Sequence, residues 1–409
     1  MAADLSFDLI RQKLTTLDST SESYAAQFVD ALLETAHHLG ASDLHLRPTP
    51  DGLELAARID GVLQPCGTFP AGKVSDVVTR LKVLADLLTY RTDVPQEGRV
   101  RSPKFAAEIR VSSFPTLHGE KAVVRLFAAE SRYPFLENLG LQADIHQWLR
   151  DVLNETSGAL LITGPAGSGK TTTAYACLRE LVKRSGAGRS IATLEDPVEV
   201  DVPGIAQSQV NPRAGFDLAA GLRSLLRQDP EVILVGEMRD PVTAGVAFQA
   251  ALTGQLVLTT FHAGSAAGAV SRLLDMGLEP YVLRSGIRAV LCQRLVRRLC
   301  TCAQLSNTPE ALLGLPVSRA KVALGCAECH GTGYRGRTLL AELLTVDMSG
   351  VAAGILARSD AAALEQTAVK SGMHTRWDCA CQAVESGITS AAEVRRVLGF
   401  SDAFSLSEG

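Results

Sequence analysis

The chain has 409 residues, which is longer than one typical domain, so we expect several domains. Its hydrophobic fraction of 46% is that of a globular protein, and its net charge of −4 argues against a general nucleic-acid-binding protein. The N-terminus lacks the pattern of a signal peptide and no long apolar run follows, so we expect a cytoplasmic protein whose nine cysteines are thiols or metal ligands.

The first part of the chain predicts a small α+β domain. Residues 1–22 are polar and become rich in Ser and Thr, which indicates an N-terminal tail. The pair Asp60-Gly61 lies between two alternating segments and favours a hairpin turn. The domain then covers 23–130, and a linker covers 131–140. Helical spacing predicts helices over 24–39 and 74–88, and alternation predicts strands over 42–47, 53–59, 99–101, 108–112 and 121–127.

From residue 141 the pattern changes to strands that alternate with helices. This predicts an α/β core with a parallel sheet over 141–295. The four residues between Glu231 and Gly236 are all apolar, as expected for a central parallel strand. The expected strands are 159–163, 191–194, 232–235 and 255–260, and the expected helices are 144–153, 170–184, 217–227 and 241–253.

Four cysteines mark the segment that follows the core. Cys326 and Cys329 are spaced as CxxC, which places two thiolates across one tight turn and is typical of a zinc site. Cys300 and Cys302 are one residue closer together, as CxC. Two interpretations stay open, a zinc site and thiols that bind no metal. We assign 296–345 to this Cys-motif subdomain and 346–409 to a C-terminal helical subdomain.

The stretch Gly158–Thr172 reads GALLITGPAGSGKTT and carries the phosphate-binding signature GxxxxGK[ST]. Glycines let several backbone N–H groups turn towards one phosphate, and the following helix directs its positive N-terminus at the same anion. Lys170 is expected to reach the β- and γ-phosphates of ATP, and the Thr171 hydroxyl to bind Mg²⁺. The candidate nucleotide-binding residues are Gly164, Pro165, Ala166, Gly167, Ser168, Gly169, Lys170, Thr171 and Thr172.

Three further candidates follow strands of the predicted sheet. Glu237 comes after the strand at 232–235 and is suited to hold Mg²⁺ through water or to orient the attacking water. Glu195 ends another strand and is a candidate general base, with a capping or loop salt bridge as the alternative. His262 follows a third strand and is a candidate γ-phosphate sensor, with a structural role as the alternative. The carboxyl ends of parallel strands share one sheet edge, so we expect these residues to lie together.

Phosphoryl transfer also needs cations, because negative charge develops on the transferred group. The first domain offers Arg99, Arg110 and Arg125, each on an expected strand. A guanidinium group can act within its own subunit or on a neighbouring one. For each arginine, the alternative is a solvated surface position.

Taken together, these motifs resemble the secretion ATPases of type II secretion and type IV pilus assembly, the GspE/PilB-like group. The resemblance extends from about Ala41 to Gly399, and it favours the cysteine-containing extension branch over the retraction ATPases. The motifs that carry it are Ala41-Ser-Asp-Leu-His-Leu-Arg-Pro48, Arg58-Ile-Asp-Gly61, Pro95-Gln-Glu-Gly-Arg99, Arg110-Val-Ser-Ser-Phe-Pro115, His118-Gly-Glu120, the P-loop, Leu194-Glu-Asp-Pro-Val-Glu199, Gln209-Val-Asn-Pro-Arg-Ala-Gly215, Gly221-Leu-Arg-Ser-Leu-Leu-Arg-Gln-Asp-Pro230, Gly236-Glu-Met-Arg-Asp240 and Gln293-Arg-Leu-Val-Arg-Arg-Leu-Cys300.

The resemblance implies a PAS-like α+β N-terminal domain, a RecA-like P-loop core, a small zinc-binding insertion and C-terminal helices. It implies a homo-hexamer that hydrolyses ATP between domains, with Arg99 and Arg110 completing the site. Glu195 then belongs to the "Asp box", Glu237 to the Walker B motif and His262 to the "His box". The implied partners are platform and docking proteins of the inner membrane, with which the cytoplasmic ATPase associates peripherally; no nucleic acid is involved.

The sequence departs from the family pattern in three places. The His box opens with Thr253-Gly254-Gln255 instead of Thr-Gly-His, and the first cysteine pair is CxC instead of CxxC. Only 1–22 precede the first expected core helix, so the chain is expected to be a short form or a truncated one that lacks the usual docking domain. Zinc at Cys300, Cys302, Cys326 and Cys329 is implied by the family despite the shorter pair.

We compare three functions that the sequence allows. The first is a motor ATPase that powers protein secretion or pilus assembly; the motifs do not distinguish secretion, pilus and competence systems. The second is a ring that binds ATP but hardly hydrolyses it and acts as a scaffold, which Gln255 and the short cysteine pair suggest. The third is a nucleic-acid helicase, which the net charge of −4 and the lack of a basic strip with interleaved aromatic residues disfavour.

Overall fold

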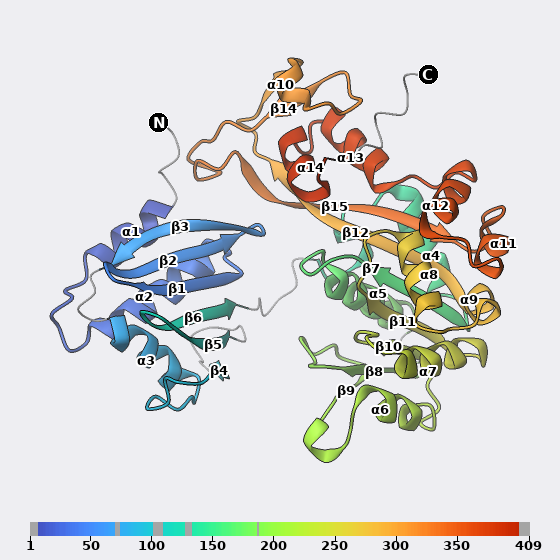
Figure 1. The fold of residues 1–409 in the computed structure, drawn as a ribbon, viewed down its shortest axis with the longest axis horizontal. Coiled ribbons are helices and arrows are strands. Elements are labelled where there is room, and N and C mark those ends of the chain that lie inside the picture. The colour runs from blue at the N-terminus through green and yellow to red at the C-terminus, as the bar shows by residue number, and fades with distance from the viewer. Residues whose placement is uncertain (1–6, 70–73, 101–108, 127–132, 186–187, 401–409) are drawn as a thin grey trace. The chain divides into compact units, whose positions relative to one another are not determined.

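The computed structural model describes residues 7–69, 74–100, 109–126, 133–185 and 188–400 (Figure 1). It forms two compact units, which we describe separately. The first unit comprises Met1–Ser131, Arg297–Leu305 and Lys321–Arg337, and the second comprises Arg132–Val296, Ser306–Ala320 and Thr338–Gly409. Parts of the strands predicted over 99–101, 108–112 and 121–127 lie outside the described residues, as does the start of the predicted linker. The six-part division made from the sequence stays a prediction.

The first unit is built on a six-stranded antiparallel sheet with the strand order β3-β2-β1-β6-β5-β4. At the hairpin between β2 and β3, Asp60 and Gly61 have φ angles of 48° and 84°, which confirms the predicted tight turn. The strands are β1 (Asp43–Thr49), β2 (Gly52–Ile59), β3 (Val62–Phe69), β4 (Gln96–Val100), β5 (Ile109–Thr116) and β6 (Gly119–Leu126).

Three helices supply the rest of this unit's core: α1 (Phe7–Thr15), α2 (Tyr24–His38) and α3 (Val74–Leu84). Alternate strand residues such as Leu44 and Leu46 are fully buried and belong to the same cluster as Phe28 and Leu32 of α2. The hydrophobic effect of this shared cluster holds the helices to the sheet. The α+β class predicted for this part of the chain is confirmed.

The second unit is built on a seven-stranded sheet with the order β15-β12-β7-β11-β10-β8-β9. The six strands from β12 to β9 in this order pair in parallel with one another, as the alternation of strands and helices predicted. The sequence did not predict the long strands β12 and β15. The strands are β7 (Gly158–Thr163), β8 (Ile191–Glu195), β9 (Ala206–Gln209), β10 (Val232–Val235), β11 (Leu256–Phe261), β12 (Ile287–Leu299) and β15 (Tyr334–Thr345).

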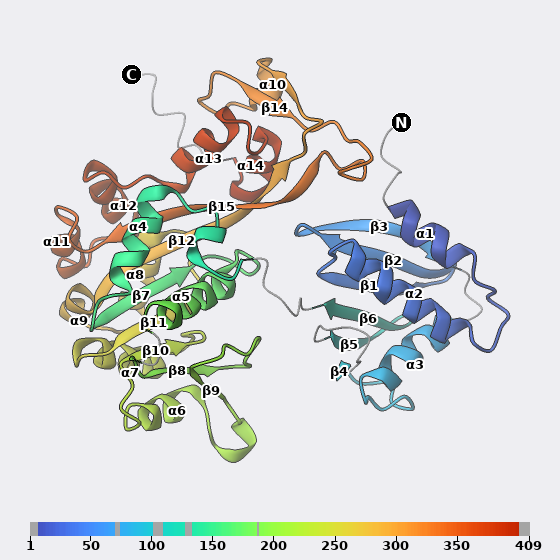
Figure 2. The same cartoon turned by 180° about the vertical axis from the view of Figure 1, so that it is seen from behind.

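Helices cover both faces of this sheet, which is why its central strands β7, β11 and β10 are buried at every position (Figures 1 and 2). Leu160 and Ile162 pack with α4 (Ala143–Val152) and α5 (Lys170–Ser185). Leu161 packs on the opposite face with the remaining core helices. These helices are α6 (Leu218–Leu225), α7 (Pro241–Leu252), α8 (Ala266–Asp275) and α9 (Pro280–Gly286).

The remainder of the chain is largely helical after residue 345, as predicted. Among the described residues, no helix combines the length and the apolar character that a bilayer crossing requires. The remaining elements are η2 (Leu136–Asn138), η3 (Pro212–Ala214), α10 (Pro309–Leu312), α11 (Val351–Leu356), α12 (Ala361–Lys370), α13 (Arg376–Glu385), α14 (Ala391–Leu398) and the paired strands β13 (Gln304–Ser306) and β14 (Ala320–Val322).

Candidate functional site

The P-loop connects the carboxyl end of β7 to the N-terminus of α5, the position where a helix favours an anion. Gly164, Gly167 and Gly169 have φ angles of 146°, 74° and 88°, which side chains with a Cβ rarely adopt. A Cβ at Gly164 would also lie 2.5 Å from the carbonyl oxygen of Gln293. The glycines of the signature are therefore required both by the backbone path and by the close approach of β12.

Lys170 is the first residue of α5, and its side chain turns back into the loop. Its Nζ donates to the carbonyl oxygens of Gly164 and Pro165, at 3.0 Å each. Burial lowers the pKa of Lys170, and the nearby Glu237 carboxylate acts in the opposite direction. The loop thus holds a partly buried cation beside the helix N-terminus, which suits it to a phosphate chain.

Glu237 and His262 follow the neighbouring parallel strands β10 and β11 and meet beside Lys170. The Nε2 of His262 lies 2.7 Å from Oε1 of Glu237, and its Nδ1 lies 3.5 Å from Nζ of Lys170. Arg239 donates to the other carboxylate oxygen of Glu237 at 2.8 Å, and this bond raises the pKa of Arg239. The structure thus brings Lys170, Glu237 and His262 together at one sheet edge.

Glu195 ends β8 at the same sheet edge, but the residue is only 3% exposed and its carboxylate is held by three donors. The hydroxyls of Tyr175 and Thr193 each donate to it at 2.6 Å, and Nε2 of Gln207 donates at 3.3 Å. Burial, followed by the bond to Glu195, raises the pKa of the Tyr175 hydroxyl. Both carboxylates thus have a protein partner on each oxygen in this conformation, but the Glu237 side chain is more accessible than that of Glu195.

The arginines of the first unit form a row across its sheet. Arg99 faces Arg110 on the next strand, and Arg110 faces Arg125 on the strand after that. The row continues through Asp43 to Arg58. The Nε of Arg125 donates to Asp43 at 2.9 Å, and the Nε of Arg58 lies 3.4 Å from the other oxygen of Asp43. One face of this sheet therefore presents several guanidinium groups with a buried carboxylate among them.

Gln255, which departs from the family pattern, immediately precedes β11. Its Oε1 accepts a hydrogen bond from the Thr253 hydroxyl at 3.1 Å. His262 follows the opposite end of the same strand. A six-residue strand is about 20 Å long, so Gln255 is well removed from the Lys170 cluster in this unit.

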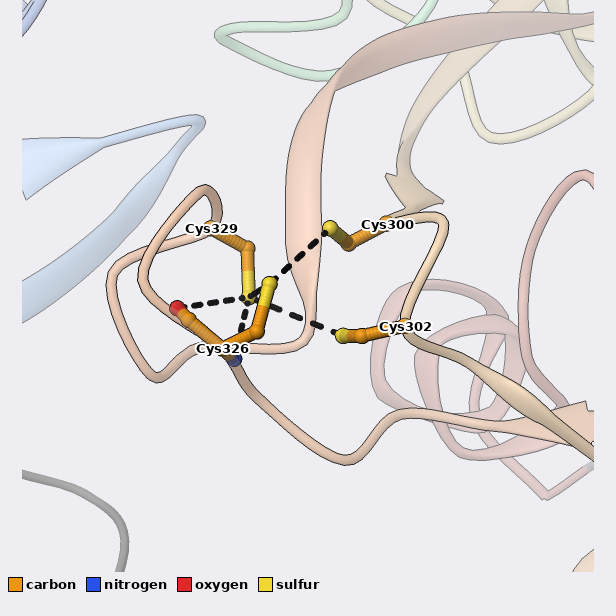
Figure 3. A group of neighbouring side chains, drawn as sticks. All are labelled: Cys300, Cys302, Cys326 and Cys329. Atoms are coloured by element: carbon orange, nitrogen blue, oxygen red, sulfur yellow. Dashed lines mark hydrogen bonds between the residues drawn. The ribbon is translucent and has the colours of Figure 1, made fainter.

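The four cysteines of the CxC and CxxC pairs converge on one point (Figure 3). Their sulfur atoms all lie within 4.8 Å of one another, with 3.7 Å between Cys300 and Cys326 and 3.8 Å between Cys302 and Cys329. Four thiolates bound tetrahedrally to Zn²⁺ at about 2.3 Å would be about 3.8 Å apart. The short CxC spacing is therefore compatible with a Cys₄ metal centre.

Backbone donors also converge on this centre. The N–H groups of Cys326 and Gly333 donate to the sulfur of Cys329 at 3.1 and 3.2 Å. Gly325 and Gly333 permit this tight fold, since a Cβ at either would lie 2.4 or 2.5 Å from a neighbouring atom. N–H groups directed at sulfur favour the thiolate form that binds a metal. The donor set fits a soft divalent cation.

Several residues beside the P-loop were missed by the sequence reasoning. Gln293 and Arg294 of β12 contact the P-loop and the loop after β11, respectively. Tyr175 holds Glu195, and Arg239 holds Glu237. The sequence contains Gln293, Arg294 and Arg239 within motifs that carried the family resemblance, but nothing local indicates their partners.

Comparisons with known proteins agree with this geometry. Residues 18–396 match the family described as Type II/IV secretion system protein. The chain is 40% identical over 384 residues to the type IV pilus assembly ATPase PilB of Thermus thermophilus. This alignment covers 91% of this chain and 43% of that protein. It is 41% identical over 391 residues to the type II secretion system ATPase E of Vibrio cholerae, covering 93% of this chain and 76% of that protein. The chain thus spans less than half the length of the Thermus relative.

Solved structures share the fold. The Legionella pneumophila ATPase DotB aligns over 90% of this chain and 94% of its own, with a TM-score of 0.66 and 23% identity. The pilus retraction motor PilT with bound ADP aligns over 92% of this chain and 98% of its own, with a TM-score of 0.62 and 24% identity. These likenesses confirm the predicted fold class, an α+β domain followed by a RecA-like P-loop core.

The family resemblance inferred from the motifs is also confirmed. The matched region covers nearly the whole chain, and the relatives are similar over more than nine tenths of it. The chain therefore belongs to the Type II/IV secretion system protein family.

Proposed function

We propose that this chain is a motor ATPase that hydrolyses ATP to ADP and phosphate and thereby powers type II protein secretion or type IV pilus assembly. The observation that carries the proposal is the meeting of Lys170, Glu237 and His262 beside a complete P-loop. The names of the related pilus and secretion ATPases indicate the machinery that the work serves.

In this mechanism the phosphate chain of ATP binds the backbone N–H groups of Gly164–Thr172 and the N-terminus of α5. Lys170 exchanges the carbonyl oxygens of Gly164 and Pro165 for phosphate oxygens. The hydroxyl of Thr171 and the carboxylate of Glu237 would hold Mg²⁺, which neutralises charge that develops on the phosphates. Hydrolysis then transfers the γ-phosphoryl group to water, with ADP as the leaving group.

The proton of the attacking water needs an acceptor, and two carboxylates lie at this sheet edge. We propose that Glu237 orients the water and that Glu195 serves as general base once its hydroxyl partners release it. His262 would report the γ-phosphate, because its Nδ1 faces Lys170 while its Nε2 donates to Glu237.

Arg99 and Arg110 are proposed to stabilise the charge on the transferred phosphoryl group within a homo-hexameric ring. Their support is the row of guanidinium groups on the first unit and the general need of phosphoryl transfer for such cations. We propose that each arginine acts on the P-loop of a neighbouring subunit, so activity is expected to depend on assembly of the ring.

We expect the ATPase rate per subunit to rise steeply with protein concentration and then to level off. Dilution separates subunits, so a site that needs two of them loses its arginines. Phosphate release measured over a hundredfold range of concentration, with light scattering to follow assembly, tests this. A constant rate per subunit across the range would contradict a shared site.

The cysteine centre is proposed to bind one Zn²⁺ per subunit through Cys300, Cys302, Cys326 and Cys329. The sulfur spacings support a tetrahedral site, and the ion would cross-link two segments that lie more than twenty residues apart in sequence. Its role would be structural, since all four positions are occupied by protein ligands.

We expect Cys326→Ser to abolish zinc binding and to lower the melting temperature by several degrees, because metal binding is coupled to folding of such sites. Metal content by mass spectrometry of protein purified without chelator provides the measurement. Cys381→Ser is the matched control, because that partly buried thiol lies on α13 outside the cluster. Negligible zinc in the unaltered protein would rule out the metal site.

We further propose that the ring works in the cytoplasm, peripherally on the inner membrane, against platform and docking proteins of the machine. The alternative of a scaffold that hardly hydrolyses ATP has little support. Gln255 contacts Thr253 at the far end of β11 from His262, and the CxC pair reaches the other two thiols. Neither departure from the family pattern thus disturbs the Lys170 cluster.

A further inference from the structure

Gln293 lies on β12, one residue beyond the position that pairs with the end of β7. Its side chain is fully buried and uses both ends of its carboxamide. The Nε2 donates to the carbonyl oxygen of Ser168 at 2.9 Å, and the Oε1 accepts from the hydroxyl of Thr173 at 3.1 Å. One side chain therefore links the end of the P-loop to the first turn of α5.

The bond to Ser168 acts on the peptide unit that carries a phosphate donor. The carbonyl of Ser168 and the N–H of Gly169 belong to the same planar trans peptide, so they point in opposite directions. A donor on β12 that holds the carbonyl directs the N–H of Gly169 away from β12. A Cβ at Gly169 would lie 3.3 Å from Nε2 of Gln293, so the glycine also lets the amide approach.

The next residue of β12 holds the second nucleotide-facing loop. Arg294 donates from Nη2 to the carbonyl oxygen of Gly264 at 2.7 Å and from Nη1 to that of Gln293 at 3.0 Å. Arg272 fixes the same loop by donating to the carbonyl oxygen of His262 at 2.6 Å. Successive residues of one strand thus contact the P-loop and the loop of His262.

We propose that Gln293 is a positioning residue for nucleotide binding, which aligns the Gly169 N–H through the carbonyl of Ser168. This inference rests on the proposed binding of ATP at the P-loop. It assigns to β12 a direct role in the phosphate site: the P-loop is shaped by a neighbouring strand as well as by its own glycines.

Two variants of Gln293 test the proposal through nucleotide affinity. Gln293→Met keeps the length of the side chain but removes both hydrogen bonds, and Gln293→Glu keeps the shape and the acceptor for Thr173 but removes the donor to Ser168. Both should raise the Kd for fluorescent ATP and ADP analogues about tenfold, as expected for a lost hydrogen bond to a buried carbonyl. Thr173→Val removes only the bond to α5 and should change the Kd less than about threefold.

The readout separates positioning from a general loss of stability. Each Kd is measured well below the melting temperature of the folded variant, which is determined in the same buffer. A Kd within twofold of the unaltered protein for both Gln293 variants would overturn the proposal, as would a Kd raised equally by Thr173→Val. If neither variant folds, Gln293 is a folding determinant and the positioning role is also overturned. Failure of the unaltered protein to bind ATP would instead refute the proposed function.

Discussion

Replacing Lys170 with alanine should lower ATP turnover at least about a hundredfold, because the variant loses the cation that stabilises charge on the β- and γ-phosphates. The ammonium donates to two loop carbonyls and lies 3.5 Å from Nδ1 of His262. Burial at the helix N-terminus means that the truncation removes a preorganised charge rather than a solvated one.

The matched control is Lys183→Ala on the same helix. Lys183 lies in the last turn of α5, where its Nζ packs 4.5 Å from the ring centroid of Phe135. It should leave turnover within about twofold, since surface cation–π contacts are weak. Phosphate release is measured for both variants at matched concentrations above the assembly range. Turnover in Lys170→Ala comparable to that of Lys183→Ala would refute the assignment of the P-loop as the hydrolytic site.

The P-loop and its surroundings differ in how far the sequence could predict them. The loop is a local feature: its glycines, lysine and threonine are adjacent in sequence, so their spacing alone predicts a phosphate site. Glu237 and His262 were predicted to share a sheet edge because each follows an apolar run, and in the structure they are in contact. That step needs only the rule that parallel strands end on the same side.

The contacts of β12 and of Glu195 were not predictable in the same way. Within β12, Ala289–Cys292 is buried like a central strand, but the residues from Arg294 onward are rich in arginine and give no alternation. Its register against β7, which places Gln293 beside the P-loop, is set by tertiary packing. Tyr175 reaches Glu195 from the helix that follows a different strand, and no local pattern encodes that pairing.

For the cysteine centre, the sequence spacing favours a metal site less than the structure does. Judged by spacing, CxC is a poorer ligand pair than CxxC. The structure compensates, because Cys300 and Cys302 each approach a different cysteine of the second pair, Cys326 and Cys329. The geometry of a four-ligand site depends on how the two turns that carry the cysteines face each other, and the spacing within one pair constrains it only loosely.

Glu237→Gln should abolish hydrolysis while leaving ATP bound, with turnover reduced at least about a hundredfold and the nucleotide Kd changed only a few fold. The amide keeps the size of the side chain but carries no negative charge for Mg²⁺ or water. It also exchanges one carboxylate oxygen for a donor, which faces either His262 or Arg239 unfavourably. Because the Glu237 side chain is only 19% exposed, solvent cannot replace the lost carboxylate efficiently.

Glu231→Gln, at the opposite end of β10 from Glu237, provides the control. Glu231 immediately precedes β10, at the edge opposite Glu237, and its Oε2 accepts from the backbone N–H of Ser190 at 2.8 Å. An amide oxygen can accept the same bond, so turnover should stay within about twofold. Single-turnover phosphate release with prebound ATP separates loss of chemistry from loss of binding. If Glu237→Gln turns over like Glu231→Gln, the essential carboxylate must be another, and the buried Glu195, freed from Tyr175 and Thr193, becomes the candidate for both roles.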